Sequence, residues 1–527
     1  MRSLGAVATS ETGSRPPGFR TRNASRHTRS ITNHVDSELF HPPVRIADRV
    51  YTLGFPFSME SFDFSRNGDL EMKSIRNLFL CALLLVAPLL AQQWKAPTTM
   101  KKLSNGLTVV VSEDHSAPTF GICVSYGIGF RLEPEGRTGF AHLFEHMMFE
   151  GTPVAPKGTL IRVIEGGGGN LNGDTRYDYT EYIETAPISA IDPVLWIEAD
   201  RMKTLDFSPK NLENQRKVVE EEVRVNVMNR PYGLFFAIDL PGKAFDTYPN
   251  AHNFYGDFKD LDAAKIDDVQ KFYEQYYTPN NAVLAIVGDV QPDQIYAKVE
   301  EYFGAIASRP TPSRPQVEEP PQTAERRSTE TDKLARVPAL AIGYRMPPRR
   351  SSDALTGAVT GELLHNGQAS LLYQSLVKDK QVALSVDGGV NWPLGTTVEY
   401  NGPTLMTSFV VCPPNLKADQ VLAAYDAAIK DLADKGPSQA DLDRIVAKMR
   451  SDLYGNLETP IDRASALSHA VLFDGNFDSV YQVPEDLAKV TPAQVRAFAA
   501  KYLVSTNRTI IDRMPEAAGG KPQGAAQ

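Results

Sequence analysis

Short apolar runs alternate with longer amphipathic stretches along most of the chain. Residues 106–112 and 340–344 are rich in Val, Leu and Ile and have the length of strands. Long amphipathic stretches with helical periodicity lie between groups of such runs. The pattern predicts an α+β fold in which helices pack on one face of a mainly antiparallel sheet.

One helix-to-strand pattern occurs twice. Residues 260–281 align with residues 486–507 without a gap, and Asp, Leu, Val, Phe, Tyr and Asn recur at a constant offset of 226. In each copy an amphipathic helix leads into an apolar strand, at residues 282–287 and 509–511. A period of this length indicates a duplicated domain rather than a solenoid.

The boundary between the copies is marked by composition. A stretch rich in Pro and charge, without apolar periodicity, predicts an extended linker at residues 309–325. We therefore expect two homologous domains, 95–308 and 326–515, each large enough for its own core, and a disordered tail at 516–527.

The beginning of the chain has a different character. Residues 72–91 carry two basic residues, then about 14 apolar ones, then a small residue, which is the pattern of a secretory signal peptide. Residues 1–71 contain nine Arg and no Lys, and we interpret them as a disordered extension read from a mis-assigned start. We expect a periplasmic or secreted protein without a stable membrane anchor after processing; an uncleaved anchor is the alternative.

Charge and cysteine content narrow the partners further. The net charge of −9 argues against nucleic acid as a partner. With Cys81 in the leader, Cys123 and Cys412 remain, one in each expected domain and both within apolar runs. They are expected to be buried thiols rather than a disulfide.

The clearest chemical signal is the sequence His142-Leu-Phe-Glu145-His146. On a helix these three polar residues share one face, so two imidazoles can bind zinc while the carboxylate reaches a water that the metal activates. The order H-x-x-E-H is the inverted form of a common zinc-protease signature, and Glu145 is the expected general base. A solvated helix face is the ordinary alternative, but apolar neighbours such as Phe140 and Met147 indicate a helix in a core.

Three segments together resemble the insulinase family of zinc peptidases, which includes pitrilysin and mitochondrial processing peptidase. They are residues 142–152, which begin with the motif, the Gly-rich stretch 165–182 and residues 218–222. The resemblance implies that Glu222 is the third ligand of one zinc ion per chain. Glu220 and Glu221 would then be its solvated neighbours.

The resemblance also implies a substrate site. Asn172, Gly173 and Thr175 fall in the family's Gly-rich segment, with Gly173 in place of the usual Ala, and an extended peptide would add edge-on to this strand. Taken alone, the four glycines also fit an ordinary flexible loop.

Two features depart from the family pattern. The acidic residue often found seven positions before the ligand glutamate is Gln215 here, and Glu213 is the neighbouring substitute for its supporting role. In the second half, Val377 and Leu384 stand where the resemblance places a substrate-gripping Arg and Tyr. Such chains in the family pair with a homologous subunit that lacks H-x-x-E-H, so we expect a heterodimer, with a homodimer as the alternative.

The sequence thus predicts a zinc-dependent endopeptidase that hydrolyses peptides or unfolded polypeptide segments and needs a partner subunit for full activity. A non-catalytic scaffold or assembly subunit of a peptidase complex is the first alternative. A zinc esterase or amidase is the second, and the peptide-binding strand disfavours it.

Overall fold

The computed structural model describes residues 94–310 and 317–516. The expected extension at 1–71, the signal peptide at 72–91, and nearly all of the tail lie outside these residues. Six residues of the expected linker do as well. All contacts below lie within one unit, Gln93–Gln527. In the described part of the chain, no helix is both long enough and apolar enough to span a membrane.

The first half contains a mixed sheet in which the strands follow the order β1-β2-β6-β3-β5-β4. Neighbouring strands are antiparallel except β2 and β6, which are parallel. Apolar β-branched residues fill its central strands, as expected for a sheet buried on both faces. The strands are β1 (Thr98–Lys102), β2 (Thr108–Glu113), β3 (Thr119–Tyr126), β4 (Asn170–Thr175), β5 (Thr180–Pro187) and β6 (Ala282–Gly288).

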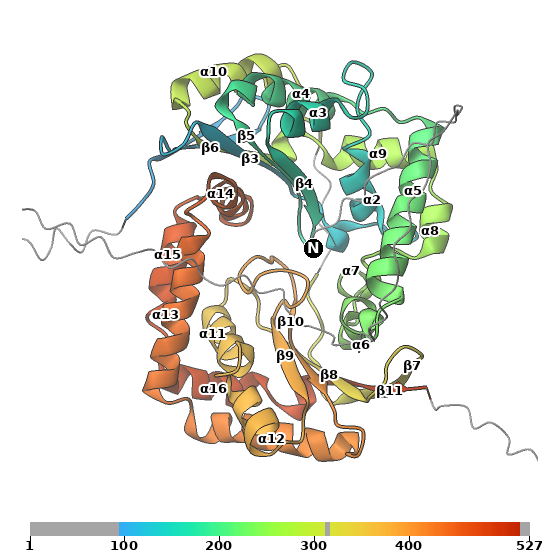
Figure 1. The fold of residues 1–527 in the computed structure, drawn as a ribbon, viewed down its shortest axis with the longest axis vertical. Helices are drawn as coiled ribbons and strands as arrows, with labels where there is room; N and C mark the ends of the chain where they lie inside the picture. The colour runs from blue at the N-terminus through green and yellow to red at the C-terminus, as the bar shows by residue number, and fades with distance from the viewer. Residues whose placement is uncertain (1–93, 311–316, 517–527) are drawn as a thin grey trace, which may run out of the picture. The chain divides into compact units, whose positions relative to one another are not determined.

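Helices of the first half, apart from two short ones at residues 240–244 and 248–251, pack on one face of this sheet and share its main apolar core (Figure 1). In β3 the alternate residues Phe120, Ile122 and Val124 point into this core, as the period of a strand requires. The helices are α2 (Phe140–Met147), α3 (Thr159–Gly166), α4 (Ile191–Lys203), α5 (Pro209–Val223), α6 (Leu240–Ala244), α7 (Tyr248–Ala251), α8 (Phe258–Asp262), α9 (Ile266–Tyr276) and α10 (Pro292–Phe303).

The second half repeats this arrangement with the strand order β7-β11-β8-β10-β9, in which only β7 and β11 are parallel. Its strands are β7 (Arg326–Asp332), β8 (Ala339–Arg345), β9 (Ser385–Val390), β10 (Leu405–Val411) and β11 (Arg508–Pro515). Its helices are α11 (Ala354–His365), α12 (Ala418–Lys435), α13 (Gln439–Gly455), α14 (Pro460–Asp474), α15 (Ser479–Leu487) and α16 (Pro492–Tyr502).

The offset seen in the sequence is preserved in the structure. Helices α9 and α16 begin and end 226 residues apart, and each leads through a short 3-10 turn into a strand, β6 or β11. The equivalent side chains Asn281 and Asn507 each donate a 2.9 Å hydrogen bond to the carbonyl that ends the preceding helix. The predicted α+β class with two homologous domains is confirmed.

The second face of each sheet is covered by a helix from the other half. Helix α14 packs through Ala464, Leu467 and Val471 on β3 and β6 of the first sheet (Figure 1). In return, α6 packs through Leu240 and Ala244 on the second sheet. The predicted packing of helices on one face therefore holds for the helices that each half places on its own sheet. The helix on the other face comes from the other half.

Candidate metal centre

Helix α2 carries most of the candidate centre, and close packing and hydrogen bonds fix its first turn. Its N-cap, Gly139, has a left-handed φ of 83°, and a Cβ there would lie 2.7 Å from the Gly256 Cα. The buried Glu133 carboxylate accepts hydrogen bonds from the backbone N–H groups of Gly139 (2.9 Å) and Ala141 (2.7 Å). An acidic group at this end satisfies free N–H groups and complements the helix dipole.

Three residues of α2 face the candidate centre, while its apolar residues face the core. His142 is buried, and His146 and Glu145 are partly buried. Leu143, Phe144 and others pack among the core residues under the first sheet. The apolar flanks in the sequence therefore have the expected consequence: one side of α2 is anchored in the core and the other carries the polar trio.

Glu222, in the last turn of α5, meets the two imidazoles. Its Oε2 atom lies 3.3 Å from His146 Nε2 and 3.8 Å from His142 Nε2, and the three donor atoms all lie within 4.8 Å of one another. Zinc bonds of about 2.0–2.2 Å in a tetrahedral site separate the ligand atoms by roughly 3.3–3.6 Å. The donor set and its spacing therefore fit a zinc ion without rearrangement of the backbone.

The protonation of His142 and Glu222 suits a bound cation, whereas His146 has to lose a proton. Burial lowers the pKa of His142, which favours the neutral imidazole that a metal requires. Burial also acts against a charge on His146, but the neighbouring carboxylates of Glu222 and Glu145 together outweigh it and raise the pKa of His146, so a metal ion must displace a proton from this ring. The hydrogen bond with His146 lowers the pKa of Glu222, so this group is a carboxylate.

Glu145 lies beside the three donors and is oriented by β4. Its Oε2 atom accepts a 2.7 Å hydrogen bond from the Thr175 hydroxyl. A Cβ at Gly173 would lie 2.9 Å from Glu145 Cγ and 3.2 Å from Phe149 Cε2. The absence of a side chain at Gly173, where the family usually has Ala, therefore lets Glu145 pack directly against the strand.

The other residue expected to contact substrate, Asn172, lies elsewhere. It is exposed, and because side chains alternate along a strand, it faces away from the side on which Gly173 and Thr175 meet Glu145. Among the described strands, β4 is at the end of the strand order and pairs only with β5. Its other edge thus presents backbone groups along the whole strand.

The two residues expected to support the ligand Glu differ in position. Gln215 is buried, and its side-chain amide donates a hydrogen bond to the buried Glu150 carboxylate. Glu213 is half exposed and pairs with Lys217 at 2.7 Å and with Arg216, so its carboxylate is engaged away from the centre. Gln215 is therefore the better placed of the two.

Two residues that support α2, Glu133 and His252, are not part of any motif in the sequence. Glu133 holds the start of α2, and His252 lies 3.1 Å from the Glu133 Oε2 atom and 2.8 Å from the Tyr248 carbonyl. Because these residues come from separate loops, spacing along the chain gives no sign of their meeting. An acidic residue a few positions before the helix is the only signal, and it is a weak one.

The second half supplies no equivalent of this centre among the residues described. Val377 is partly buried against the second core, and Leu384 is 54% exposed. One other group of potential metal donors occurs in the described chain, formed by Cys123, Glu181 and His469.

Comparisons with known proteins agree with this architecture. The model of the "Insulinase (Peptidase family M16)" family matches residues 108–238, and that of the "Peptidase M16 inactive domain" matches residues 263–449. The zinc protease PqqE of Helicobacter pylori is 26% identical over 447 residues, covering 84% of this chain and 98% of that protein. A probable mitochondrial-processing peptidase subunit beta of Arabidopsis thaliana is 28% identical over 214 residues, 41% of this chain and 40% of that protein.

Solved structures share the fold. The crystal structure of a protease from Helicobacter pylori superposes with a TM-score of 0.74 at 23% identity and covers 80% of this chain and 100% of that chain. The periplasmic protease PqqL from Escherichia coli gives a TM-score of 0.65 at 16% identity, over 80% of this chain and 48% of that chain. The two domain models, which together match more than half of the sequence, and the relatives named zinc proteases show that the chain belongs to the insulinase (M16) peptidase family.

Proposed function

We propose that this protein is a zinc-dependent endopeptidase whose metal is held by His142, His146 and Glu222. The observation that carries the proposal is the convergence of two imidazole nitrogens and one carboxylate oxygen from α2 and α5 beside a separately oriented Glu145. A bound zinc ion supplies Lewis-acid polarisation of a water molecule and of the peptide carbonyl. The chain's own residues supply the remaining steps.

Glu145 is the proposed general base and acid. It is on the same helical face as the two histidines but projects toward Thr175, so its second carboxylate oxygen is available to take a proton from the attacking water. The same group then delivers that proton to the leaving amine. The Thr175 hydroxyl fixes the orientation of the carboxylate throughout both transfers.

The free edge of β4 is the proposed substrate site. An extended peptide that pairs with this edge would be hydrogen-bonded through its backbone next to Glu145. This binding mode requires an unfolded or extended segment, because a folded substrate has no free strand to add. Gly173 and Thr175 would line the approach to the reacting bond, and Asn172 would contact the substrate from the opposite face.

A homologous partner subunit and a periplasmic or secreted location complete the proposal. The second half presents Val377 and Leu384 rather than charged or phenolic groups at the expected gripping positions, which supports a partner that provides them. The likeness to a periplasmic protease supports export. The alternative, a scaffold subunit, requires that no peptide be cleaved either by this chain alone or with its partner.

The decisive experiment compares cleavage of a quenched-peptide library by the full chain, alone and with a homologous subunit from the same genome. We expect chelator-sensitive cleavage, and Glu145→Gln should lower kcat/KM by about 10²–10⁴-fold while zinc remains bound. Glu221→Gln, an exposed neighbour on α5, is the matched control and should leave the rate unchanged. Cleavage that survives Glu145→Gln would refute the assignment of the base. Absence of cleavage by the wild-type chain, both alone and with the homologous subunit, would favour the scaffold alternative over the peptidase.

A further inference from the structure

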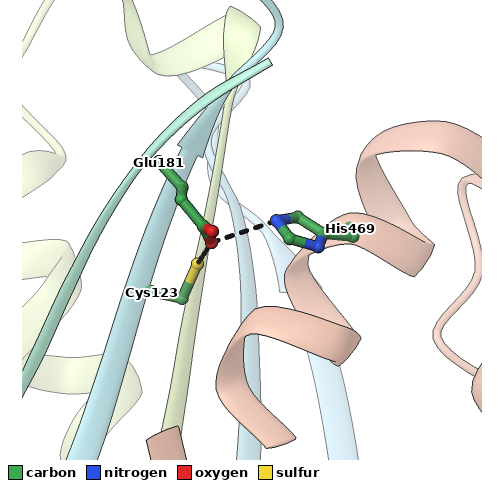
Figure 2. A group of neighbouring side chains, drawn as sticks. All are labelled: Cys123, Glu181 and His469. Atoms are coloured by element: carbon green, nitrogen blue, oxygen red, sulfur yellow. Dashed lines mark hydrogen bonds and ion pairs between the residues drawn. The ribbon is translucent and has the colours of Figure 1, made fainter. Parts of the chain in front are cut away.

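A second group of metal-donor side chains lies where α14 meets the first sheet (Figure 2). Cys123 comes from β3, Glu181 from β5 and His469 from α14. The Glu181 Oε2 atom is 3.1 Å from Cys123 Sγ and 3.0 Å from His469 Nε2, and the three donor atoms lie within 4.8 Å of one another. All three residues are buried.

The surroundings make a purely hydrogen-bonded role costly. The interface between α14 and the sheet is largely apolar, with Val110, Ala285 and Leu467 among its residues, although buried polar groups such as Ser468 and Arg463 also lie in it. Removing ionisable groups from water in such a place carries a desolvation penalty that ion pairing repays only in part. A metal ion shared by the same groups repays it more fully, because metal–ligand bonds are stronger than hydrogen bonds.

A fourth residue, Glu399, holds His469 in the way that carboxylates hold the ligand histidines of known metal sites. The other ring nitrogen of His469, Nδ1, lies 3.2 Å from Glu399 Oε1. Histidines that bind a metal through one nitrogen usually donate the other N–H to a carboxylate, which fixes the ring and its tautomer. His469 therefore presents Nε2 to Glu181 and Cys123 in the orientation of a ligand.

The net charge of the cluster is the same with a bound divalent ion as without one. In the metal-free cluster one proton joins Cys123 to Glu181, and imidazole protons join His469 to Glu181 and Glu399. Entry of a divalent cation displaces the thiol proton and the Nε2 proton, so two protons leave and the net charge of the cluster stays the same. The buried site thus needs no additional counter-charge.

From this geometry we propose that Cys123, Glu181 and His469 bind a structural zinc ion that fastens α14 to the first sheet. One thiolate, one imidazole and one carboxylate form a donor set that suits zinc, which accepts sulfur, nitrogen and oxygen ligands. The Ser125 hydroxyl, 3.3 Å from Cys123 Sγ, is a further oxygen beside the site. This ion is additional to the single zinc expected from the sequence and does not depend on the proposed peptidase activity.

The test exploits the thiolate, which the H-x-x-E-H centre lacks. The full chain is produced in zinc-supplemented medium, and its metal content and zinc X-ray absorption are measured. We expect two zinc ions per chain and a sulfur neighbour at about 2.3 Å. His142→Ala combined with His146→Ala should remove one ion and keep the sulfur neighbour.

The matched variants are Cys123→Ser and Cys412→Ser, since both are buried and, among the residues described, only Cys123 belongs to a group of three metal donors. After growth on cobalt, the wild type and Cys412→Ser should show the thiolate-to-cobalt charge-transfer band, and Cys123→Ser should lose it. Absence of the band and of the sulfur neighbour in the wild type, or persistence of the band in Cys123→Ser, would overturn the proposal. The wild-type spectra decide even if Cys123→Ser does not fold.

Discussion

His365 should make the protein's stability fall as the solution is acidified from neutral pH. It ends α11 and is buried, with Nδ1 2.8 Å from the Gly361 carbonyl and Nε2 2.7 Å from the Ser408 hydroxyl. The Ser408 hydroxyl is in turn 2.9 Å from the Tyr425 hydroxyl. A neutral ring that donates from Nδ1 and accepts at Nε2 satisfies this arrangement.

Burial lowers the pKa of His365 to about 4 from an ordinary value of 6.5. Below pH 6.5 the unfolded chain gains a proton at this residue while the folded chain does not, so acid favours unfolding. The contribution is fully present above the unfolded pKa and is lost as the pH falls toward the folded pKa. The complete difference is about 3 kcal/mol, of which about 2 kcal/mol is lost by pH 5.

The assay is urea unfolding of the wild type and His365→Gln at several pH values between 7.5 and 5. Subtracting the two free energies of unfolding cancels the carboxylates common to both proteins. The variant should be less stable at neutral pH, because it loses ring packing, and the gap should shrink by about 2 kcal/mol at pH 5.

The control is His115, whose effect on stability changes with pH in the opposite direction. His115 is exposed, and hydrogen bonds with Asp289 and Glu113 raise its pKa, so its stabilising effect is present at low pH and lost as the pH rises. The gap between wild type and His115→Gln should therefore widen on acidification. A gap for His365→Gln that stays constant or widens would refute the buried, neutral state.

Three further substitutions test the centre and the interface. Thr175→Val removes the 2.7 Å hydrogen bond to Glu145 and should lower kcat/KM by about 10- to 100-fold with zinc retained, while Thr175→Ser keeps the rate; an unchanged rate in Thr175→Val would contradict the orienting role. Glu222→Gln should lose zinc from the H-x-x-E-H centre, whereas Glu220→Gln should keep it because Glu220 pairs with Arg224; equal zinc loss in both would show that the wrong ligand has been chosen. Gly121→Val should lower the free energy of unfolding by about 1–3 kcal/mol, and with it the melting temperature, because a Cβ there would lie 2.7 Å from the Ile461 backbone. The control is Gly166→Ala, where an added Cβ would have no atom within 4 Å. Equal melting temperatures of the two variants would contradict close packing of α14 on β3.

The repeated part of the fold was predictable because it is local. The helix-to-strand unit of α9 and β6 recurs in α16 and β11, and every boundary except the end of the strand is shifted by the same number of residues. The exchange of α14 and α6 between the halves was not predictable. An apolar stripe shows that a helix is buried, but Leu467 or Leu240 carries no information about which sheet covers it.

The same distinction applies to the sites. His142, Glu145 and His146 are one helical turn apart, so helix geometry alone brings them together. Glu222 is on another helix, and only the family resemblance indicates it as a ligand. Cys123, Glu181 and His469 come from three distant segments, and only the folded chain shows that their donor atoms meet.

Strand β5 connects these two sites because its neighbouring residues face opposite sides of the sheet. Tyr182 points toward α2, and its hydroxyl donates a 3.2 Å hydrogen bond to the Phe144 carbonyl, within the H-x-x-E-H helix. Glu181 points toward α14 and contacts His469 at 3.0 Å. Since α14 belongs to the second half, that half holds in place the strand on which α2 rests. The second half, in which the described residues form no H-x-x-E-H centre, is therefore part of the support for the candidate metal centre of the first half. A chain that lost α14 would leave Cys123 and Glu181 uncovered on the back of the same sheet.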